Sequence, residues 1–95
     1  MTHLRHKLVL SGTGAALDGA LVRLAPARYA VLKALAREPG RISSRRELLA
    51  ELPSGHATHE PALEAAVARL RGAVRVDLVR TVVKRGYRLA AQEPV

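Results

Sequence analysis

The sequence predicts one α+β domain in which an N-terminal antiparallel sheet precedes three helices and a C-terminal β-hairpin. Three observations support this fold class: strand-like runs broken by turn signals over residues 4–24, helical periodicity over 26–75, and a β-branched run with a returning strand over 78–90. The chain has 95 residues, which is enough for one modest core and too few for a second. We therefore expect a single domain over residues 1–95.

The N-terminal segment carries two turn signals between apolar runs. The stretch 7–10 is strand-like and is followed by a Ser-Gly-Thr-Gly turn cluster. Asp18-Gly19 lies between two short apolar runs and is a strong hairpin signal, because both residue types tolerate positive φ. These signals predict a small sheet within residues 4–24.

Two helices are predicted from their start and stop signals. Pro26 suits the first helical position, and Pro39-Gly40 ends a helix of about 26–38. Ser44 and Glu47 form a capping-box pattern that begins a second helix of about 44–52. Its first turn contains Arg45 and Arg46, which face an unfavourable helix dipole unless an anion lies nearby. Both are candidate phosphate contacts, and exposed arginines without a ligand are the open alternative.

The third helix, about 61–75, has an apolar stripe and an unusual opposite face. The stripe is formed by Leu, Val, Leu and Val at positions 63, 67, 70 and 74. The opposite face presents Ala65 and Ala68, with Arg69 on one flank and Arg71 and Arg75 on the other. Such a face can enter a DNA major groove, where arginines reach guanine edges or phosphates and alanines pack on thymine methyl groups.

The C-terminal hairpin, residues 78–90, continues the basic surface. A strand that contains Arg80 and Thr81 is followed by a turn with Lys84, Arg85 and a glycine. We interpret these four residues as further candidate DNA contacts. A helix beside a basic hairpin can hold a duplex at two grooves.

Charge composition favours an anionic partner. The formal net charge is +8, with sixteen basic and eight acidic residues, and only Lys7, Lys33 and Lys84 among the basic residues are not arginine. The planar guanidinium matches phosphates and guanine edges, so this excess favours nucleic acid. A solvated basic surface without a ligand is the alternative that composition leaves open.

Several other classes of protein are excluded or disfavoured. The absence of Cys excludes disulfide scaffolds and cysteine-ligated zinc, and no apolar run reaches the ~20 residues of a membrane span. The pairs His3/His6 and His56/His59 have no feature that would bring them together as a metal site. No catalytic constellation or phosphate loop is present. We expect a cytoplasmic protein that is not an enzyme, has no cofactor or metal, and does not bind membranes.

The order of elements and four stretches resemble the C-terminal winged-helix effector domain of OmpR/PhoB-type response regulators. These stretches are 24–32, 39–49, 63–71 and 81–89. The resemblance implies a winged helix-turn-helix with a four-stranded N-terminal sheet, the third helix in the major groove and the hairpin wing near the minor groove. It also implies double-stranded DNA binding in transcription regulation, usually as tandem copies. We expect the isolated domain to be a monomer.

The resemblance also implies roles for individual residues. Arg69 occupies a base-reading position, Arg71 a phosphate-binding position, and Thr81 a position that meets the DNA backbone. Glu64 takes an acidic position whose role is structural. The segment 53–60 corresponds to the part through which activators of the family contact RNA polymerase.

The chain departs from the family pattern at several positions. Ala25 replaces a helix-capping Thr, Arg28 stands where an acid is common, and the wing has Val83 and Lys84 where the family has arginine and glycine. These departures move basic charge to the hairpin tip. The alanine-lined outward face of the third helix leaves an alternative function open, a winged-helix protein-interaction module with little or no DNA specificity. The ending 82–89 also resembles effector domains that actinobacteria attach to uroporphyrinogen-III-synthase-like domains.

Overall fold

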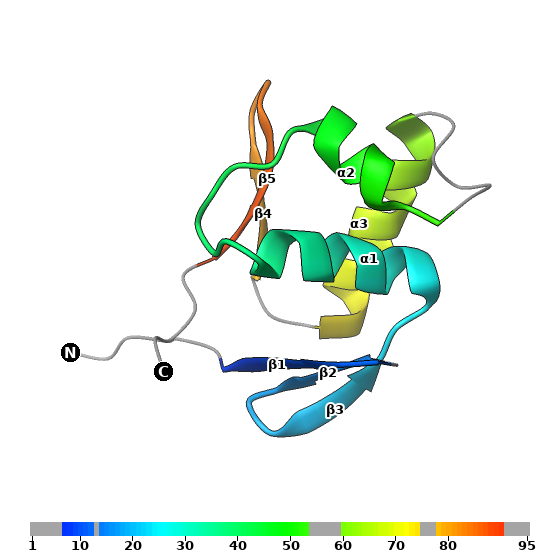
Figure 1. The fold of residues 1–95 in the computed structure, drawn as a ribbon, viewed down its shortest axis with the longest axis vertical. Helices are drawn as coiled ribbons and strands as arrows, with labels where there is room; N and C mark the ends of the chain where they lie inside the picture. The colour runs from blue at the N-terminus through cyan, green and yellow to red at the C-terminus, as the bar shows by residue number, and fades with distance from the viewer. Residues whose placement is uncertain (1–6, 13, 54–59, 75–77, 91–95) are drawn as a thin grey trace.

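The computed structural model describes residues 7–12, 14–53, 60–74 and 78–90 and confirms the predicted fold class (Figure 1). A small sheet lies beneath a group of three helices, and a two-stranded hairpin stands beside the third helix. The elements in chain order are β1 (Leu8–Ser11), β2 (Gly14–Leu17), β3 (Ala20–Arg23), α1 (Pro26–Ala36), α2 (Arg45–Glu51), α3 (Glu60–Val74), β4 (Val79–Val82) and β5 (Gly86–Leu89).

The N-terminal sheet is antiparallel with the strand order β1-β2-β3. Its second turn is the predicted hairpin, since Asp18 has φ 51° and Gly19 has φ 87°. The Asp18 carboxylate also accepts a hydrogen bond of 2.8 Å from the backbone N–H of Lys7. The described residues form three strands in this sheet, whereas the family resemblance implied four.

Helix α1 begins at Pro26 and buries Val31, Leu32 and Leu35. It ends at Ala36, before the predicted Glu38, and the chain then turns through Gly40, whose φ is 88°. Helix α2 begins with the predicted capping box, in which the Ser44 hydroxyl accepts from the Glu47 N–H and the Glu47 carboxylate accepts from the Ser44 N–H. These local hydrogen bonds explain why a short helix begins there.

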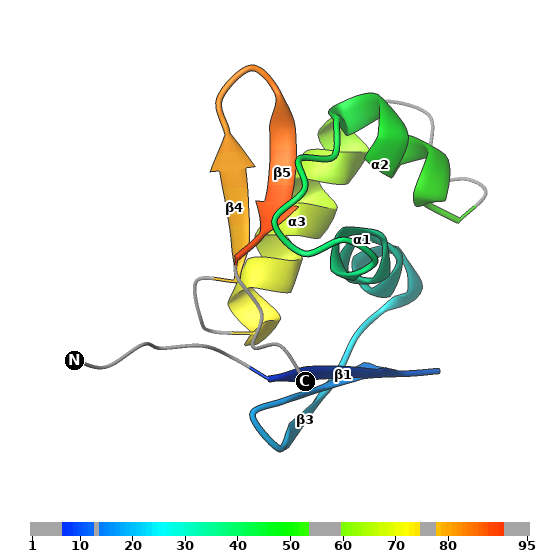
Figure 2. The ribbon, with the colours of Figure 1, turned by 60° about the vertical axis from the view of Figure 1, so that its left-hand side comes forward.

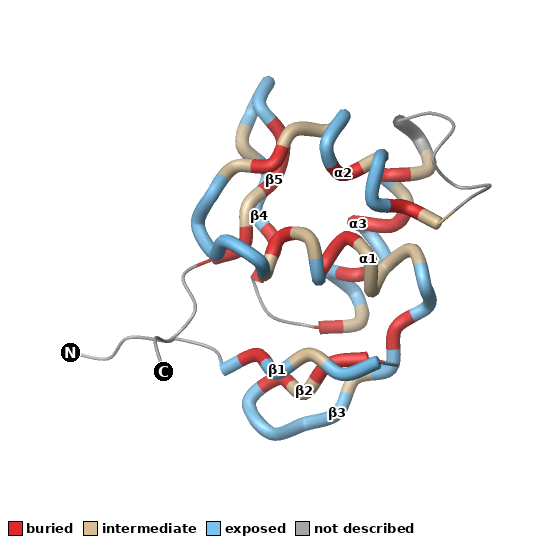
Figure 3. The backbone as a smooth tube through the Cα atoms, viewed as in Figure 1, coloured by how far each residue is buried: buried red, intermediate tan, exposed pale blue. Residues whose placement is uncertain are grey.

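The apolar stripe of α3 forms the centre of the core. Leu63, Val67, Leu70 and Val74 are all at most 4% exposed, as the helical spacing predicted. Figure 3 shows buried residues along the sides of α1, α2 and α3 that face one another. Within the described ranges, no helix is long and apolar enough to cross a membrane.

The C-terminal hairpin is joined to the segment that precedes α2. Strands β4 and β5 pair antiparallel, and the Leu78 carbonyl accepts a 2.7 Å hydrogen bond from the Ala90 N–H just outside them. On the other side of β5, Ser43 and Tyr87 exchange two backbone hydrogen bonds of 2.8 and 3.0 Å. The hairpin is therefore fixed by backbone contacts to the residues before α2 as well as by its own pairing (Figure 2).

Candidate nucleic-acid interface

The outward face of α3 is a flat strip bordered by cations. Ala68 and Gly72 are exposed and Ala65 is half-buried, while Arg69 and Arg71 are exposed on the two flanks. A Cβ built on Gly72 would meet nothing within 4 Å. An α-helix with small outward side chains can approach another surface closely, which suits a helix that enters a groove of DNA.

The side of α3 nearest the hairpin carries a hydrogen-bonded cluster around Tyr87. The Tyr87 side chain is 1% exposed, and its hydroxyl donates a 2.5 Å hydrogen bond to Glu64 of α3. The same carboxylate accepts a 2.9 Å hydrogen bond from the Arg45 Nε of α2. The guanidinium carbons of Arg45 and Arg71 lie 5.5 and 5.9 Å from the centre of the Tyr87 ring. This cluster joins α2, α3 and β5 at one point.

Arg71 extends the cluster to the first strand of the hairpin. Its Nε donates to the Val79 carbonyl at 3.1 Å, and its Nη2 donates to the Thr81 hydroxyl at 2.7 Å. One arginine of α3 thus binds β4 at two residues, the backbone of Val79 and the side chain of Thr81. The angle between the hairpin and α3 is consequently fixed by side-chain hydrogen bonds as well as by packing.

The cluster shifts the pKa values of its two ionisable partners in opposite directions. The hydrogen bond from Tyr87, followed by the one from Arg45, lowers the pKa of the Glu64 carboxyl. Burial raises the pKa of the Tyr87 hydroxyl, and its hydrogen bond to Glu64 adds to this effect. Both shifts favour an ionised Glu64 and a neutral Tyr87 at neutral pH, which is the pair that makes the observed hydrogen bond.

The hairpin turn presents an exposed tip with one unusual backbone conformation. The Arg85 N–H donates to the Val82 carbonyl at 2.9 Å, and Lys84 between them has φ 64°. Val83 is 77% exposed, and Lys84 and Arg85 are also exposed. A lysine in the left-handed region costs about 1–2 kcal/mol relative to a normal conformation. The tip therefore carries two cations and the exposed aliphatic side chain of Val83. Glycine would be less strained than lysine at position 84.

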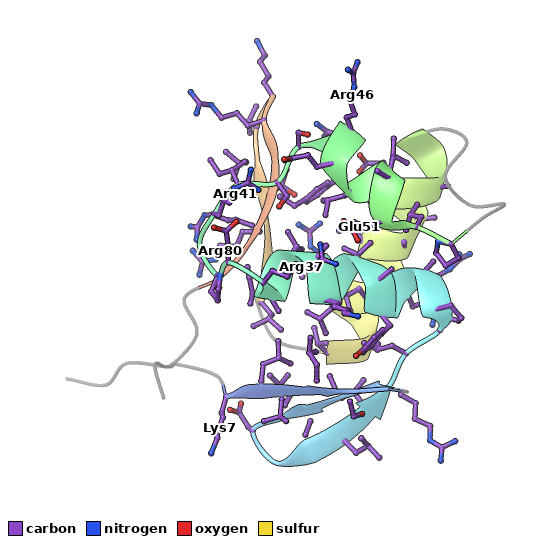
Figure 4. The ribbon with its side chains drawn as sticks, in the orientation of Figure 1. Lys7, Arg37, Arg41, Arg46, Glu51 and Arg80 are labelled. Atoms are coloured by element: carbon purple, nitrogen blue, oxygen red, sulfur yellow. The ribbon has the colours of Figure 1, made fainter. Side chains whose placement is uncertain are left out.

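The start of α2 contributes one further exposed cation. Arg46 points away from the molecule at the end where the hairpin tip also lies (Figure 4). Among the described residues it makes no ion pair, in contrast to its neighbour Arg45.

Hydrogen bonding to the Ser44 backbone, and then to Arg41, lowers the pKa of the Glu47 carboxyl. The ionised carboxylate accordingly serves the helix cap.

Comparison with known proteins assigns the chain to a family. Residues 19–89 match the family described as "Transcriptional regulatory protein, C terminal". The chain belongs to this family. No curated protein gave a significant match in the corresponding sequence comparison. The family consists of DNA-binding regulatory domains and is not a family of enzymes.

Solved structures of transcriptional regulatory C-terminal domains share the fold. The C-terminal domain of the nisin resistance regulator NsrR is 27% identical over 93% of this chain and 94% of that chain, with a TM-score of 0.74. The C-terminal DNA-binding domain of RstA from Klebsiella pneumoniae is 25% identical over 95% and 92%, also with a TM-score of 0.74. The DNA-binding domain of the response regulator AdeR, solved in complex with an intercistronic region, is 17% identical over 95% and 98%, with a TM-score of 0.77.

These comparisons confirm the predicted resemblance to OmpR/PhoB-type effector domains. The additional resemblance to domains attached to uroporphyrinogen-III synthase finds no support in them.

The structure of this regulatory domain separates the predicted DNA-contact residues into two groups. One group has intramolecular partners: Arg45 bonds Glu64, and Arg71 bonds Thr81. Arg80 lies in β4 directly opposite Arg88 and also has a partner. The second group makes no ion pair with any described residue and consists of Arg46, Arg69, Lys84 and Arg85. These four remain the cations with the greatest freedom to bind a ligand.

Three predicted features lie outside the described residues. They are Arg75, the histidine pairs at 3/6 and 56/59, and all of the 53–60 segment except its two ends. Sequence reasoning assigned Glu64 a structural role but did not find its partner, because Tyr87 lies 23 residues away on another element. The only signal in the sequence for this contact was that Glu64 and Tyr87 each lie in a stretch that resembles the family, 63–71 and 81–89.

Proposed function

We propose that this chain is the double-stranded-DNA-binding effector domain of a bacterial transcription regulator. The observation that supports this most strongly is the pairing of two surfaces: the flat, arginine-flanked face of α3 and a hairpin tip that carries Lys84 and Arg85. The cluster at Tyr87 and Glu64 holds these surfaces in a fixed relation. Membership of the transcriptional regulatory family supports the same function. So do the related domains whose structures were solved with an intercistronic region or with the RstA box.

In the proposed complex, α3 occupies the major groove and the hairpin, as a wing, lies at the minor groove or the adjacent backbone. Ala65, Ala68 and Arg69 face the major groove, since they form the outward side of α3. Lys84 and Arg85 contact the DNA from the wing tip. Arg46 reaches a phosphate from the start of α2, because it lies free at the same end of the molecule as the wing tip.

The residues with intramolecular partners act less directly. Arg45, Arg71 and Thr81 position the wing and α2 around α3 and contact phosphates only at the edge of the interface. Arg80 supplies positive charge on the outer face of β4, opposite Arg88.

Duplex binding over a series of salt concentrations tests this function. Fluorescence anisotropy with a pool of duplexes should give affinity at low salt that falls steeply with salt, since counterions are released from phosphates. Selection of bound duplexes from a random pool would then reveal the preferred sequence. Absence of binding at low salt would overturn the proposal. A stable protein partner together with flat DNA titrations would instead favour a protein-interaction module.

The finer aspects of regulation extend this proposal. We place the protein in the cytoplasm, where its DNA target lies. The 53–60 segment between α2 and α3 is the proposed contact with RNA polymerase, and tandem pairs on direct repeats are the proposed arrangement on DNA. Crosslinking through a cysteine introduced at Thr58 to RNA polymerase at a promoter complex would test the polymerase contact.

A further inference from the structure

A basic groove lies on the flank of α3 away from the wing. It has a volume of about 270 Å³ and separates the start of α1 from the first half of α3. Two arginines border it, the half-buried Arg28 from α1 and the exposed Arg69 from α3. The remaining lining is apolar, and no carboxylate lines the groove within the described part of the chain; the other lining residues are Ala25, Pro26, Ala27, Ala62, Ala65 and Ala66.

The groove between α1 and α2 shows the contrasting arrangement, in which every lining arginine is matched by an acid. Arg37 donates to both carboxylate oxygens of Glu51 at 3.0 and 3.2 Å. Arg41 pairs with Glu47 at 3.1 Å and with Glu38 at 3.4 Å. Figure 4 shows Arg37, Arg41 and Glu51 on this side of the molecule. Of these two grooves, the α1–α3 groove is therefore the one whose lining arginines have no lining carboxylate.

The first turn of α1 adds to the positive potential of the groove. Its N-cap, Ala25, makes no side-chain cap hydrogen bond, and the first turn contains no acid. Arg28 lies in that turn, where the positive end of the helix dipole disfavours a cation. An anion in the groove would offset the unfavourable interaction of Arg28 with the helix dipole and the repulsion between the two arginines.

The position of the groove identifies the source of such an anion. Ala65 and Arg69 line the groove and also belong to the outward face of α3. Arg71, on the opposite flank of that face, holds the wing through Thr81. A helix in the major groove, which is about 12 Å wide, has a phosphate backbone on each side. The wing is on one side, so the groove lies where the backbone of the other side would pass.

We propose that the α1–α3 groove binds a backbone phosphate of the strand opposite the wing, with Arg28 and Arg69 as its ligands. The proposal rests on the DNA-binding function proposed above and assigns Arg69 to the backbone rather than to a base edge. Arg28 thereby becomes a DNA-contact residue. The domain then holds both strands that border the major groove, one through the wing and one through this groove.

The test compares Arg28→Gln and Arg69→Gln with the control Arg23→Gln. Arg23 is an exposed arginine of β3 outside the groove, so its substitution removes the same charge from the 95-residue chain. Anisotropy at 0.1 M salt should show that each groove variant binds DNA up to about eightfold more weakly than wild type. The loss should be the same for selected and random duplexes. The slope of log affinity against log salt should decrease in magnitude by about 0.9 for each variant. Arg23→Gln should change both quantities much less.

Equal effects of all three substitutions would overturn the proposal, and so would an Arg69→Gln effect confined to one base position. Amide chemical shifts of the wild-type protein give a second measurement that does not depend on a variant. Duplex should perturb the amides of Ala27, Arg28 and Arg69, and a single methylphosphonate at the contacted position should remove the perturbation. Perturbation by inorganic phosphate but not by duplex would also overturn it. Absence of any duplex binding would instead refute the proposed function itself.

Discussion

The Tyr87 hydroxyl donates a 2.5 Å hydrogen bond to Glu64, and this contact joins the wing to α3. The carboxylate belongs to the same turn of α3 as Ala65, which lies on the proposed DNA face. Arg45 of α2 binds the other carboxylate oxygen at 2.9 Å. One side chain thus fixes α2 and the wing relative to α3, so the geometry of the interface depends on a contact that does not itself touch DNA.

Tyr87→Phe should lower the free energy of unfolding by about 1 kcal/mol. A hydrogen bond to a charged group contributes about 1.5–3 kcal/mol, and we expect a loss below this range because water can replace the hydroxyl at the half-exposed Glu64. The phenylalanine ring still fills the buried site. Thermal unfolding should show a decrease in Tm of about 4–8 °C. Tyr29→Phe is the matched control, because the Tyr29 hydroxyl has no partner among the described residues, and a comparable loss there would contradict the assignment.

Stability at acid pH should depend on Glu64. The folded state lowers the Glu64 pKa, chiefly through Tyr87 and then Arg45. The contribution of Glu64 to the free energy of unfolding is therefore fully present above the usual glutamate pKa of about 4.3. It is lost as the pH falls through the lower pKa of the folded state. The free energies of unfolding of wild type and Glu64→Gln in urea should differ most near pH 6–7 and converge as the pH falls through the lowered pKa of Glu64. A difference that stays constant across this range would show that the charge of Glu64 is not the stabilising element.

Local signals predicted the elements, whereas the contacts between elements came only from the structure. Asp18-Gly19 and the Ser44–Glu47 capping box act within a few residues, so the sequence alone shows their effect. The partners of Glu64 are 19 and 23 residues away and belong to different elements. Arg45 looked like a free cation in the sequence because nothing local revealed its carboxylate.

The groove beside Arg69 illustrates the same limit for the candidate site. The helical spacing placed Arg69 on the flank of the outward face of α3. It could not show which element lies against that flank, because the crossing of α1 and α3 is a property of the packed core. The proximity of Arg28 and Arg69 follows from that crossing.

Thr81→Val should loosen the wing without changing its shape. The substitution removes the hydroxyl that accepts from Arg71 at 2.7 Å and leaves the second Arg71 hydrogen bond, to Val79, in place. The expected decrease in unfolding free energy is about 1 kcal/mol, since the acceptor is exposed and its partner is charged. Hydrogen exchange at the Arg85 amide should become faster. Thr81→Ser retains an acceptor and should behave like wild type; faster exchange in both variants would argue against the Arg71 contact.

Lys84→Gly should stabilise the fold and weaken DNA binding. The lysine has φ 64°, and a glycine at this position removes a strain of about 1–2 kcal/mol, partly offset by greater flexibility of the unfolded chain. The net gain should be about 0.5–1 kcal/mol in urea unfolding. Anisotropy should show lower affinity for all duplexes because a phosphate contact is lost. Lys84→Asn is the control, because asparagine also lacks the charge and tolerates positive φ. It therefore separates the effect of charge on DNA binding from the effect of backbone strain on stability. Unchanged affinity in both variants would exclude the wing tip from the interface.

Gly86→Ala and Gly72→Ala should change stability in opposite directions. Gly86 has φ 145°, and a Cβ there would lie 2.0 Å from the Ser43 carbonyl oxygen, against the segment that pairs with β5. Backbone strain and the forced displacement of Ser43 should together cost about 3 kcal/mol or more. Gly72 is helical with open space at its Cβ, so alanine should add up to about 1 kcal/mol through helix propensity. Urea unfolding of the two variants measures both effects. If Gly86→Ala retained wild-type stability, the close approach of β5 to Ser43 would be wrong, and with it the fixed position of the wing.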